Sequence, residues 1–343
     1  MRIGSFEISD TSPPCLVCEI GINHNGSLLE AKKIVDAAIN SGAKIIKHQT
    51  HIVDDEMSNE ASNIIPPHTK ESIFDIMKSC ALNEKDEFDL MNYVKSKGAV
   101  FISSPFSREA ANRLAKFEIP AFKIGSGECN NYPLIKHISD FNKPMIISTG
   151  MNSIESIKPT VEILRNKNIP FSLLHCTNIY PTPAKLVRLD AIKTLKNAFP
   201  DAIIGLSDHT TSNYTCFGAV ALGAKIIEKH FTDTKSRIGP DIECSMDQED
   251  LKDMIFGINT IFQAGGEKKV PLQEEEGVIK FAFASVVSIE DIKEGELFSK
   301  KNIWVKRPGN GDFKAREFEY LIGKKAKNFI KKDTQIKKTD VSI

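Results

Sequence analysis

Short apolar runs rich in β-branched residues recur along the first 230 residues, and each run has the length of a strand. Between the runs, apolar residues recur at every third or fourth position, which predicts amphipathic helices. The stretch 28–42 keeps its apolar residues on one face and ends at Gly42, and the stretch 83–98 starts at a capping Asn83. The eight predicted strands are 15–21, 43–49, 99–104, 121–126, 144–150, 171–177, 202–207 and 224–230.

The alternation of strands and helices predicts a parallel sheet built from right-handed βαβ units. Eight such units within about 250 residues match the size of a closed (β/α)8 barrel of the TIM type. An open doubly wound sheet is the alternative. Such sheets commonly carry a glycine-rich phosphate fingerprint, and neither GxGxxG nor GxxxxGK[ST] occurs here. The sequence therefore favours the barrel.

The composition changes after residue 263. Residues 264–280 are rich in glycine and charge and are predicted to be a linker, which leaves 1–263 as the barrel domain. Residues 281–343 contain short β-like pieces and are predicted to form a small second domain. Because a domain of fewer than about 70 residues has little apolar core, we expect it to rest against another surface.

Charge and cysteine content exclude several classes of protein. The chain has 45 Lys and Arg against 45 Asp and Glu, so neither a nucleic acid nor a membrane surface is expected as its partner. It contains no basic and apolar leader and no apolar run of about 18 residues, which indicates a cytoplasmic protein. The seven cysteines are irregularly spaced, and the side chains of Cys15 and Cys18 would face opposite sides of a strand, so reduced thiols are expected.

Polar side chains stand at the carboxyl ends of all eight predicted strands. In a parallel barrel these ends meet at one mouth, where the active sites of such barrels lie. A single polar ending is equally well explained as a loop or a cap, but a complete ring favours a binding site. The ring comprises Glu19, Lys47, Gln49, Ser104, Lys123, Ser126, Glu128, Ser148, His175, Asn178, Ser207, His209, Glu228 and His230.

Two lysines of the ring predict a site for an anion. Lys47 and Lys123 end apolar strands, and hydroxyl donors follow at neighbouring ends, a combination that suits a ligand with phosphate and carboxylate groups. The alternative is an ion pair within the mouth, with Glu128 or Glu228 as the partner of either lysine. The hydroxyl donors are Ser104, Ser126, Ser148 and Ser207.

Two histidines of the ring predict a metal site. His209 and His230 follow consecutive strands, and two imidazoles with water and substrate oxygens suit a divalent ion such as Mn²⁺. A structural role for the pair is an equally open alternative. His175 lies within its strand and is expected to bond locally. Asp208 is expected to orient either His209 or the end of an adjacent helix, and the sequence does not choose between these roles.

Long motifs spread over the chain carry a more specific signal. They are CEIGINHNG, IKHQTHIVDDEMS, FKIGSGECNNYPLIKHI, STGMNSIESIK, HCTNIYPTP, GLSDHT and EKHFTDTKSRIGPDIECSMD. These motifs closely resemble the bacterial sialic acid (N-acetylneuraminate) synthase family, which includes the legionaminic and pseudaminic acid synthases. WVKRPGNGDF near the carboxyl end resembles the antifreeze-like (SAF) domain of that family. The resemblance spans nearly the whole chain and implies a TIM barrel followed by a SAF domain.

The resemblance implies a reaction in which phosphoenolpyruvate and open-chain N-acetylmannosamine give N-acetylneuraminate and inorganic phosphate. It also implies a divalent metal, usually Mn²⁺ with Mg²⁺ or Co²⁺ as alternatives, acting as a Lewis acid on the sugar aldehyde. A domain-swapped homodimer is expected, in which the small domain of one chain covers the barrel of the other. Glu128 is expected to stabilise positive charge on phosphoenolpyruvate, and Glu19 either transfers a proton or bonds a sugar hydroxyl.

The matching motifs also imply a role for the other site residues. His209 and His230 should bind the metal. Arg307 should reach the sugar from the partner subunit, with a solvated surface turn as the alternative. The residues expected around phosphoenolpyruvate are Lys47, Ser104, Lys123, Ser126, Ser148, Asn178 and Ser207. Those expected at the sugar are Glu19, Gln49, Tyr180 and Asp241.

Two departures from the family pattern concern the substrates. Ser104 stands where a threonine is expected, which keeps the hydroxyl. His68 stands where sialic acid synthases carry a sugar-binding asparagine, so a legionaminic acid synthase that uses 2,4-diacetamido-2,4,6-trideoxymannose is an alternative. A Schiff-base pyruvate aldolase with Lys123 or Lys47 as nucleophile is an alternative of another class, and a sugar-binding barrel without catalysis is a third.

Overall fold

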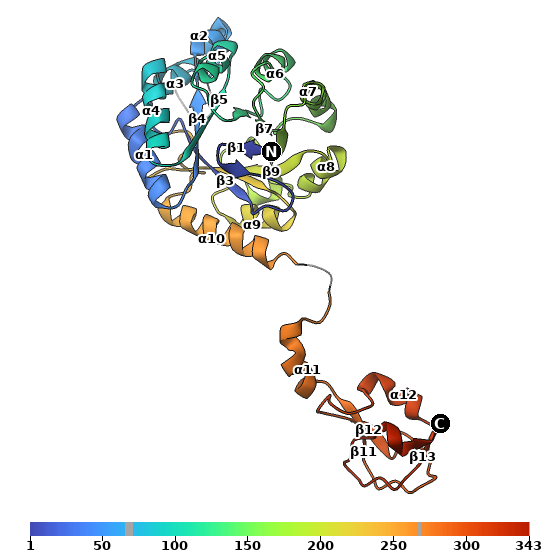
Figure 1. Ribbon diagram of the computed structural model, residues 1–343. Helices are drawn as coiled ribbons and strands as arrows, with labels where there is room; N and C mark the ends of the chain where they lie inside the picture. Colours follow the sequence, from blue (N-terminus) through green and yellow to red (C-terminus); the bar gives the residue numbers. More distant parts are fainter. Residues whose placement is uncertain (66–70, 267–268, 343) are drawn as a thin grey trace. The chain divides into compact units, whose positions relative to one another are not determined.

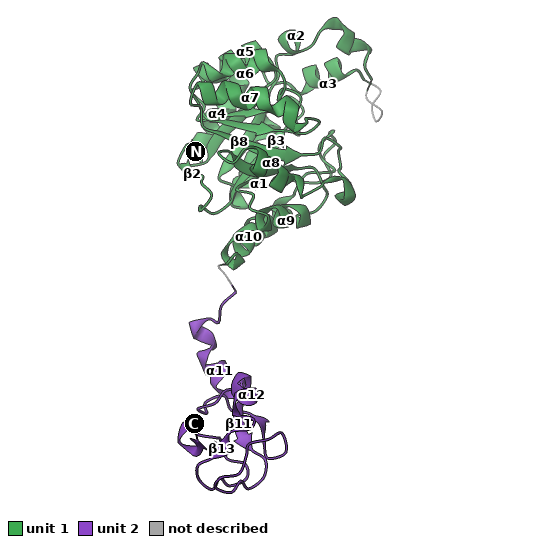
Figure 2. Cartoon of the chain, turned by 90° about the vertical axis from the view of Figure 1, so that its right-hand side faces the viewer, with its two compact units in different colours: residues 1–266 green, residues 267–343 purple. Residues whose placement is uncertain are grey.

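The computed structural model describes residues 1–65, 71–266 and 269–342, and the chain divides into two compact units (Figure 2). Unit 1 comprises Met1–Gly266 and unit 2 comprises Glu267–Ile343.

Parallel strands in unit 1 close into an eight-stranded barrel, as the alternation of strands and helices predicted. The order of strands around the barrel follows the chain, and the last strand pairs with the first. Figure 1 shows the barrel surrounded by its helices. The strands are β3 (Cys15–Gly21), β4 (Ile45–Thr50), β5 (Val100–Pro105), β6 (Phe122–Ile124), β7 (Met145–Ser148), β8 (Phe171–Cys176), β9 (Ile203–Asp208) and β10 (Ile226–His230).

The helices that follow the strands pack one apolar face against the barrel wall. Ser27 caps the first turn of the first of these helices by accepting a hydrogen bond from the backbone N–H of Glu30 (3.4 Å), and Asn83 caps another as predicted. Gly42 has a φ of +102°, a conformation that any side chain would strain. The outer helices are α1 (Leu28–Asn40), α4 (Glu84–Ser96), α5 (Arg108–Lys116), α6 (Tyr132–Ser139), α7 (Ile154–Asn166), α8 (Ala191–Ala198), α9 (Tyr214–Ala221) and α10 (Gln248–Ala264).

A hairpin that the sequence analysis did not predict closes the amino-terminal end of the barrel. It consists of β1 (Arg2–Ile3) and β2 (Phe6–Glu7), and it places Ile3 and Ile8 against inward-facing residues of the barrel strands. The hairpin therefore extends the apolar core of the barrel at this end. The barrel residues in this buried cluster are Val17, Ile45, Ile102, Ala121, Ile146, Leu174 and Ile226.

The segment between β4 and α4 adds α2 (Val53–Glu56), a 3₁₀ helix η1 (Asn59–Asn63) and α3 (Ile73–Cys80). Figure 2 shows α2 and α3 at the end of unit 1 that lies away from the amino terminus. His68, on which the uncertainty about the sugar depends, lies in 66–70, outside the described residues.

Unit 2 has an apolar core of its own. Its strands β11 (Ser285–Ser288) and β12 (Ile303–Lys306) pair antiparallel, and α11 (Glu276–Ala282) occupies part of the range that was predicted as a linker. Residues 334–340 form no regular strand and contribute one isolated bridge, between Val287 and Gln335. The remaining elements are η3 (Gln273–Glu275), η4 (Ala315–Glu317), α12 (Phe318–Leu321), β13 (Lys325–Ala326), η5 (Lys338–Asp340) and β14 (Val341–Ser342).

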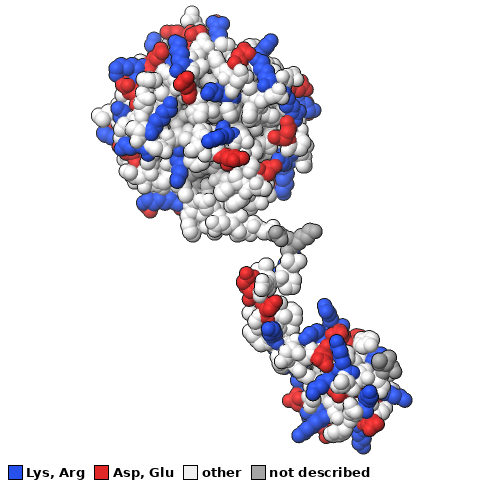
Figure 3. All heavy atoms as spheres, in the orientation of Figure 1, with Lys and Arg blue, Asp and Glu red and all other residues white. Residues whose placement is uncertain are grey.

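Basic and acidic side chains are interspersed on the face of the molecule that Figure 3 shows, as expected from the balanced composition. All seven cysteines are free thiols, as predicted. Within the described residues, no helix combines the length and apolar character needed to cross a bilayer.

Candidate active site

A cavity of about 760 Å³ opens at the carboxyl ends of the barrel strands. Its wall contains every predicted site residue of unit 1 except Glu19. The structure therefore brings together the two lysines and the two histidines on which the prediction of a site depended. The predicted residues in the wall are Lys47, Gln49, Ser104, Lys123, Ser126, Glu128, Ser148, Asn178, Tyr180, Ser207, His209, His230 and Asp241.

Lys47 points into the mouth from β4 and is buried beside two carboxylates. Its Nζ lies 2.5 Å from Oε2 of Glu19 and 3.9 Å from Oε1 of Glu228, and it donates a hydrogen bond to Oγ of Ser104 (3.3 Å). Burial acts to lower the pKa of Lys47, but the two carboxylates outweigh burial and leave the pKa raised. Lys47 is therefore a fixed positive charge in the mouth.

Lys123 on β6 is surrounded by three oxygen acceptors. Its Nζ donates to Oγ of Ser148 (2.8 Å) and to the backbone carbonyl of Ile124 (3.1 Å), and it lies 3.4 Å from Oε1 of Glu228. Burial lowers the pKa of Lys123, although Glu228 acts in the opposite direction. Because three acceptors match the three N–H bonds of an ammonium group, the geometry suits the charged form.

Glu228 on β10 connects the two lysines. Its Oε1 accepts a hydrogen bond from Ser207 (3.1 Å), while its buried Oε2 has no hydrogen-bond partner among the described residues. Burial acts to raise the pKa of Glu228, but Lys123 and Lys47 outweigh it and leave the pKa lowered. Both lysines therefore make ion pairs within the mouth, Lys123 with Glu228 and Lys47 with Glu19 and Glu228. The sequence placed Glu228 in the ring of polar strand ends and named it as one of two partners for a lysine, but assigned it no role toward a substrate.

Glu19 is buried beneath the mouth and not in the wall of the cavity. Its Oε1 accepts a hydrogen bond from Nε2 of Gln49 (2.7 Å), and its Oε2 pairs with Lys47. Gly21 has a φ of +49°, and a Cβ there would lie 3.0 Å from Oε1 of Glu19. In this geometry Glu19 orients Lys47 and Gln49, and the two roles expected from the sequence, proton transfer or a bond to a sugar hydroxyl, stay predictions.

A glycine allows the loops after three strands to approach one another closely. The backbone N–H of Gly150 donates to Oγ of Ser126 (3.0 Å), and a Cβ at this position would lie 1.8 Å from Oδ1 of Asn178. Ser126 and Asn178, both predicted ligands of phosphoenolpyruvate, are therefore held against the same stretch of backbone. A larger residue in place of Gly150 would displace both.

Glu128, in the loop after β6, makes no ion pair with any described residue, so it is not the lysine partner that was considered as an alternative to Glu228. Burial, together with the nearby Glu56, raises the pKa of Glu128 to about 7. A Cβ at Gly125 would lie 2.7 Å from Oε2 of Glu128, so this glycine makes room for the carboxyl group. Near neutral pH this group can give or take a proton.

His209 and His230 lie side by side, with ring centroids 5.5 Å apart, and the ring of Tyr180 lies 4.0 Å from that of His209. Nδ1 of His209 is 2.9 Å from the backbone carbonyl of Thr177. Because a carbonyl only accepts, Nδ1 must carry the proton, which leaves the lone pair on Nε2. Burial lowers the pKa of both histidines, so both imidazoles are neutral, the form that binds metals.

The donors at this histidine pair fit a divalent metal with open coordination positions. Nδ1 of His230 is buried without a hydrogen-bond partner among the described residues, and it lies 3.6 Å from Oδ2 of Asp241. No group of three or more His, Cys, Asp or Glu side chains with the spacing of a complete metal site occurs in the described parts of the chain. A metal at His209 and His230 would take its other ligands from water and substrate.

Asp208 faces away from the cavity. Its Oδ1 accepts a hydrogen bond from Oγ1 of Thr215 in the first turn of α9 (2.9 Å), and its Oδ2 pairs with the buried Lys229. No hydrogen bond joins Asp208 to His209. Of the two roles left open by the sequence, the helix-end role is the one that the structure shows.

Two other histidines near strand ends also face outward. Nε2 of His175 bonds the backbone carbonyl of Val187, which is the local role expected from its position. His48, for which the sequence suggested no role, lies between Nε2 of His24 (3.2 Å) and Oε1 of Glu87 (3.1 Å) in the helical layer. Neither His175 nor His48 belongs to the cavity.

Two family patterns match the chain: the NeuB family over residues 34–270 and the SAF domain over residues 283–342. The chain belongs to the NeuB family. The predicted family, the SAF domain and the predicted class of synthase are therefore confirmed.

Individual relatives agree with this assignment. The chain is 37% identical to N,N′-diacetyllegionaminic acid synthase of Campylobacter jejuni, over 94% of this chain and 98% of the relative. It is also 37% identical to an uncharacterised protein of Methanocaldococcus jannaschii, over 96% and 94% of the two chains. Among solved structures, the N-acetylneuraminic acid synthetase of Leptospira borgpetersenii in complex with citrate aligns with a TM-score of 0.74 and 28% identity, covering 81% of this chain and 94% of that one.

The sequence analysis missed the apolar part of the cavity wall in this NeuB family member. Ile22 follows β3, and Met57, Ile73 and Met77 come from the segment between β4 and α4. These residues are on the side of the mouth formed by neighbouring strands β3 and β4, which also carries Gln49. Ile73 and Met77 lie one turn apart on α3, a spacing that core-facing helix residues share, and Ile22 and Met57 lie outside regular elements, so no signal in the sequence set these residues apart from core residues.

Arg307 lies in unit 2, directly after β12, and its side chain is exposed. The loop that it begins is held at several points. The carbonyl of Pro308 accepts a hydrogen bond from Oγ of Ser285 (2.8 Å), and the N–H of Gly309 donates to the carbonyl of Lys280 (2.9 Å). The SAF domain therefore presents this guanidinium to solvent from a well-fixed backbone.

Proposed function

We propose that the chain condenses phosphoenolpyruvate with an open-chain N-acylated mannosamine to form a nine-carbon 2-keto acid and inorganic phosphate. The observation that most directly supports this proposal is the convergence of Lys47, Lys123, His209 and His230 on one cavity. Ammonium and hydroxyl groups suit the phosphate and carboxylate of phosphoenolpyruvate, and the histidine pair suits a metal that binds sugar oxygens. Membership of the NeuB family supports the same class of reaction.

The phosphoenolpyruvate end of the cavity is formed by two lysine–serine pairs. Lys47 with Ser104 comes from β4 and β5, and Lys123 with Ser148 comes from β6 and β7. Each pair presents an N–H or O–H donor at the end of a buried strand, so the donors are fixed before the substrate arrives. On binding, the oxygens of the substrate replace part of the lysines' present contacts with Glu228.

The sugar end is formed by strands next to one another in the barrel. Gln49 lies on β4, and Asp241 lies in the loop after β10. Strand β3 lies between these two strands and carries Glu19. Glu19 takes no part in this proposal as a direct sugar ligand, because its two oxygens already hold Gln49 and Lys47. Its proposed role is to orient Gln49 for the sugar and Lys47 for phosphoenolpyruvate.

In the proposed reaction, C3 of phosphoenolpyruvate forms a bond to the aldehyde carbon of the sugar, and positive charge develops at C2. The ionised Glu228 is placed to stabilise that charge, with Glu128 as the second carboxyl group. As the C–C bond forms, the aldehyde oxygen takes up a proton and becomes a hydroxyl; at the end, the C–O bond to phosphate breaks while the C2 hydroxyl loses its proton to the phosphate and becomes the ketone. Between these steps, water adds at C2 and loses a proton to a base. Glu128, with its pKa of about 7, is suited to accept that proton.

His209 and His230 would hold the divalent ion, Mn²⁺ or alternatively Mg²⁺ or Co²⁺. The ion would supply Lewis acidity toward the sugar aldehyde and would add positive charge to a mouth whose lysines and glutamates balance one another. The chain's own contribution is to keep both imidazoles neutral through burial, while the carbonyl of Thr177 fixes the tautomer of His209.

A Schiff-base aldolase requires a neutral lysine as nucleophile. The three acceptors around Nζ of Lys123 and the paired carboxylates around Lys47 instead favour ammonium groups. Treatment with pyruvate and borohydride should therefore leave the mass of the chain unchanged. A covalent adduct on either lysine would contradict the synthase proposal.

For the sugar, the apolar wall favours 2,4-diacetamido-2,4,6-trideoxymannose over N-acetylmannosamine, the substrate that the sequence favoured. The trideoxy sugar carries a methyl group at C6 and a second acetamido group, and both present apolar surface where N-acetylmannosamine has hydroxyls. Ile22, Met57, Ile73 and Met77 can bury that surface without leaving a hydroxyl unpaired.

The decisive experiment measures phosphate release from phosphoenolpyruvate with Mn²⁺ and each of the two sugars. We expect kcat/KM for the trideoxy sugar to exceed that for N-acetylmannosamine by about tenfold. The variant Met77→Gln should reduce that ratio, whereas Met151→Gln, on the other side of the same cavity, should leave it unchanged. An equal or reversed preference would refute the choice of sugar, and no phosphate release with either sugar would refute the reaction.

The SAF domain is proposed to cover the barrel of a second copy in a domain-swapped homodimer, with Arg307 contacting the sugar. The exposed guanidinium on a fixed loop supports this role. Deleting 281–343 should leave a folded barrel with little activity. Full turnover by the truncated chain would contradict a covering role for the domain.

A further inference from the structure

The loop between β10 and α10 carries Asp241, and its two ends are joined at the base. The N–H of Thr232 donates to the carbonyl of Met246 (2.9 Å), and the N–H of Met246 donates to the carbonyl of His230 (2.7 Å). Residues 233–245 therefore form an excursion that leaves the barrel and returns to it beside His230. The path of this excursion determines where Asp241 lies.

Asp241 has no side-chain hydrogen bond to hold it in place. Its carboxylate makes none with any described residue, and its Oδ2 lies 3.6 Å from Nδ1 of His230. Without such bonds, the location of this carboxylate follows that of its backbone. The position of this group in the cavity therefore depends on the contacts that hold the excursion.

The two halves of the excursion are held differently. After Asp241, Ile242 is buried and Oγ of Ser245 donates to the Asp241 carbonyl (2.7 Å), while Asn23 donates to the same Oγ (3.0 Å). Before Asp241, Ile238 is 89% exposed. Apolar burial therefore fixes only the second half, and the first half needs a polar anchor.

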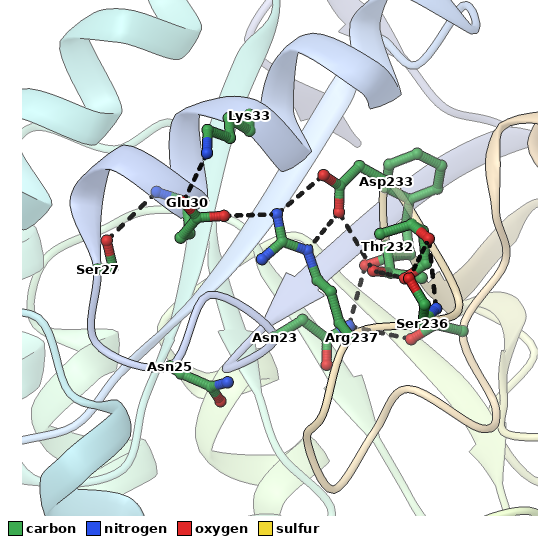
Figure 4. A network of polar contacts seen from close by, with 12 residues as sticks. Asn23, Asn25, Ser27, Glu30, Lys33, Thr232, Asp233, Ser236 and Arg237 are labelled. Carbon is green, nitrogen blue, oxygen red and sulfur yellow. Dashed lines mark hydrogen bonds and ion pairs between the residues drawn. The ribbon is translucent and has the colours of Figure 1, made fainter.

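Arg237 supplies that anchor, as Figure 4 shows. Its Nη2 donates to Oε2 of Glu30 on α1 (2.8 Å) and to Oδ2 of Asp233 (2.8 Å), and its Nε donates to the other oxygen of Asp233. Nδ2 of Asn25 donates to the carbonyl of the adjacent Ile238 (2.9 Å). The Arg237 side chain is only 16% exposed, so solvent screens these contacts less than those of surface ion pairs.

We propose that Arg237 is a positioning residue for the sugar end of the site, because it ties the excursion to α1 and thereby holds Asp241 in the cavity. The inference rests on the proposed function, in which Asp241 contacts the sugar. The planar fork of Arg237 is essential to this role, since it bonds two carboxylates from different elements at once. The residues expected at phosphoenolpyruvate come from other strands, so their positions do not depend on this anchor.

The test compares Arg237→Ala with the wild-type chain, varying each substrate in turn. We expect the KM for the sugar to rise about tenfold and the KM for phosphoenolpyruvate to stay within about twofold. Arg165→Ala is the matched control, because Arg165 makes a two-pronged pair with Asp201 on the outside of the barrel. That control should change neither KM.

A double variant distinguishes a positioning role of Arg237 from a general loss of structure. If Arg237 acts through Asp241, adding Arg237→Ala to Asp241→Asn should raise the sugar KM by less than about twofold. An equal rise in both KM values, or a full tenfold further rise in the Asp241→Asn background, would overturn the inference. An unchanged sugar KM in Arg237→Ala would overturn it as well.

Hydrogen exchange tests the anchor without any substrate. Backbone amides of 238–245 should exchange about tenfold faster in Arg237→Ala and at the wild-type rate in Arg165→Ala. If the wild-type chain releases no phosphate, the proposed function fails, and this measurement alone decides on the anchor: unchanged exchange would refute it. Should Arg237→Ala not fold, Glu30→Gln removes one of the two contacts and is expected to act in the same direction.

Discussion

Two adjacent rings of inward-facing side chains in the same barrel have opposite chemistry. Along β3, Val17 precedes Glu19 by two positions, and along β4, Ile45 precedes Lys47 by two. The lower ring belongs to the apolar cluster under the hairpin, and the upper ring belongs to the site. Two residues of a strand span about 7 Å, so the apolar core and the site are only about 7 Å apart along each strand. The same spacing occurs at Ile102–Ser104, Ala121–Lys123, Ile146–Ser148 and Ile226–Glu228.

The two rings indicate that the residues that stabilise this barrel are distinct from the residues of its site. Apolar burial in the lower ring holds the strands in place without help from the site. The charges of the upper ring are buried against each other, as in the pairs of Lys47 with Glu19 and Lys123 with Glu228, and such pairs add little net stability. Substitutions in the upper ring should therefore reduce activity, and substitutions in the lower ring should reduce stability.

The largest effect is expected for Lys123→Met, which removes a charge from the upper ring but keeps most of the volume. Loss of a fixed donor at the phosphoenolpyruvate end should lower kcat/KM about 10²–10³-fold in the phosphate-release assay. Circular dichroism should show a folded chain. A decrease of less than tenfold would show that Lys123 holds no substrate.

Ile146→Ala breaks the lower ring two positions before Ser148. The cavity left by the deleted atoms should reduce the free energy of unfolding by about 3 kcal/mol, measured by denaturant titration. The variant that remains folded at 20 °C should keep kcat within about threefold of wild type. A variant that is stable but inactive would contradict the separation of the two rings.

Glu128→Gln tests the comparison of the two rings through the pH dependence of the free energy of unfolding. The pKa of Glu128 is about 7 in the folded chain, against an ordinary 4.5, so between these values the folded state keeps a proton that the unfolded state releases. Stability from this group is therefore present at low pH and is lost as pH rises through about 7. Relative to wild type, Glu128→Gln should gain about 1–2 kcal/mol between pH 4.5 and pH 8, after allowance for partial exposure. Parallel stability curves for the two proteins would contradict the raised pKa.

The smallest change in stability is expected for an ion pair on the outside of the barrel, where the charged side chains are exposed to solvent. Arg165 and Asp201 form an ion pair whose side chains are 42% and 48% exposed. Asp201→Asn should change the free energy of unfolding by less than about 1 kcal/mol and should leave activity unchanged. A larger decrease in the free energy of unfolding, measured by thermal unfolding, would mean that this ion pair stabilises the fold more than an exposed pair is expected to.

Much of the fold could be predicted from local patterns. Strand-like runs alternating with helical periodicity predicted the barrel, and Asn83 and Gly42 predicted helix ends, because capping and chain reversal depend on a few neighbouring residues. The N-terminal hairpin was missed because strands of two residues carry no periodic signal. The SAF domain followed from its motif, whereas the helix α11 within the predicted linker did not.

The site could be predicted as a set of residues but not as a set of contacts. The rule that parallel strand ends converge placed Lys47, Lys123, His209 and His230 together, and the cavity contains all four. The same rule does not tell which side of a strand end faces the cavity, so Asp208 remained undecided until its bonds to α9 were seen. The metal, the homodimer and the role of Arg307 stay predictions.

The sequence by itself determined the barrel, the ring of polar strand ends and the family, because periodicity, strand-end chemistry and long motifs are all local in the chain. Only the tertiary structure decided which carboxylate meets which lysine, since Glu228 reaches Lys123 only when the strands close into a barrel. The same holds for Arg237 and Glu30, which are 207 positions apart. Contacts at such separations follow from strand register and side-chain direction, which no local pattern contains.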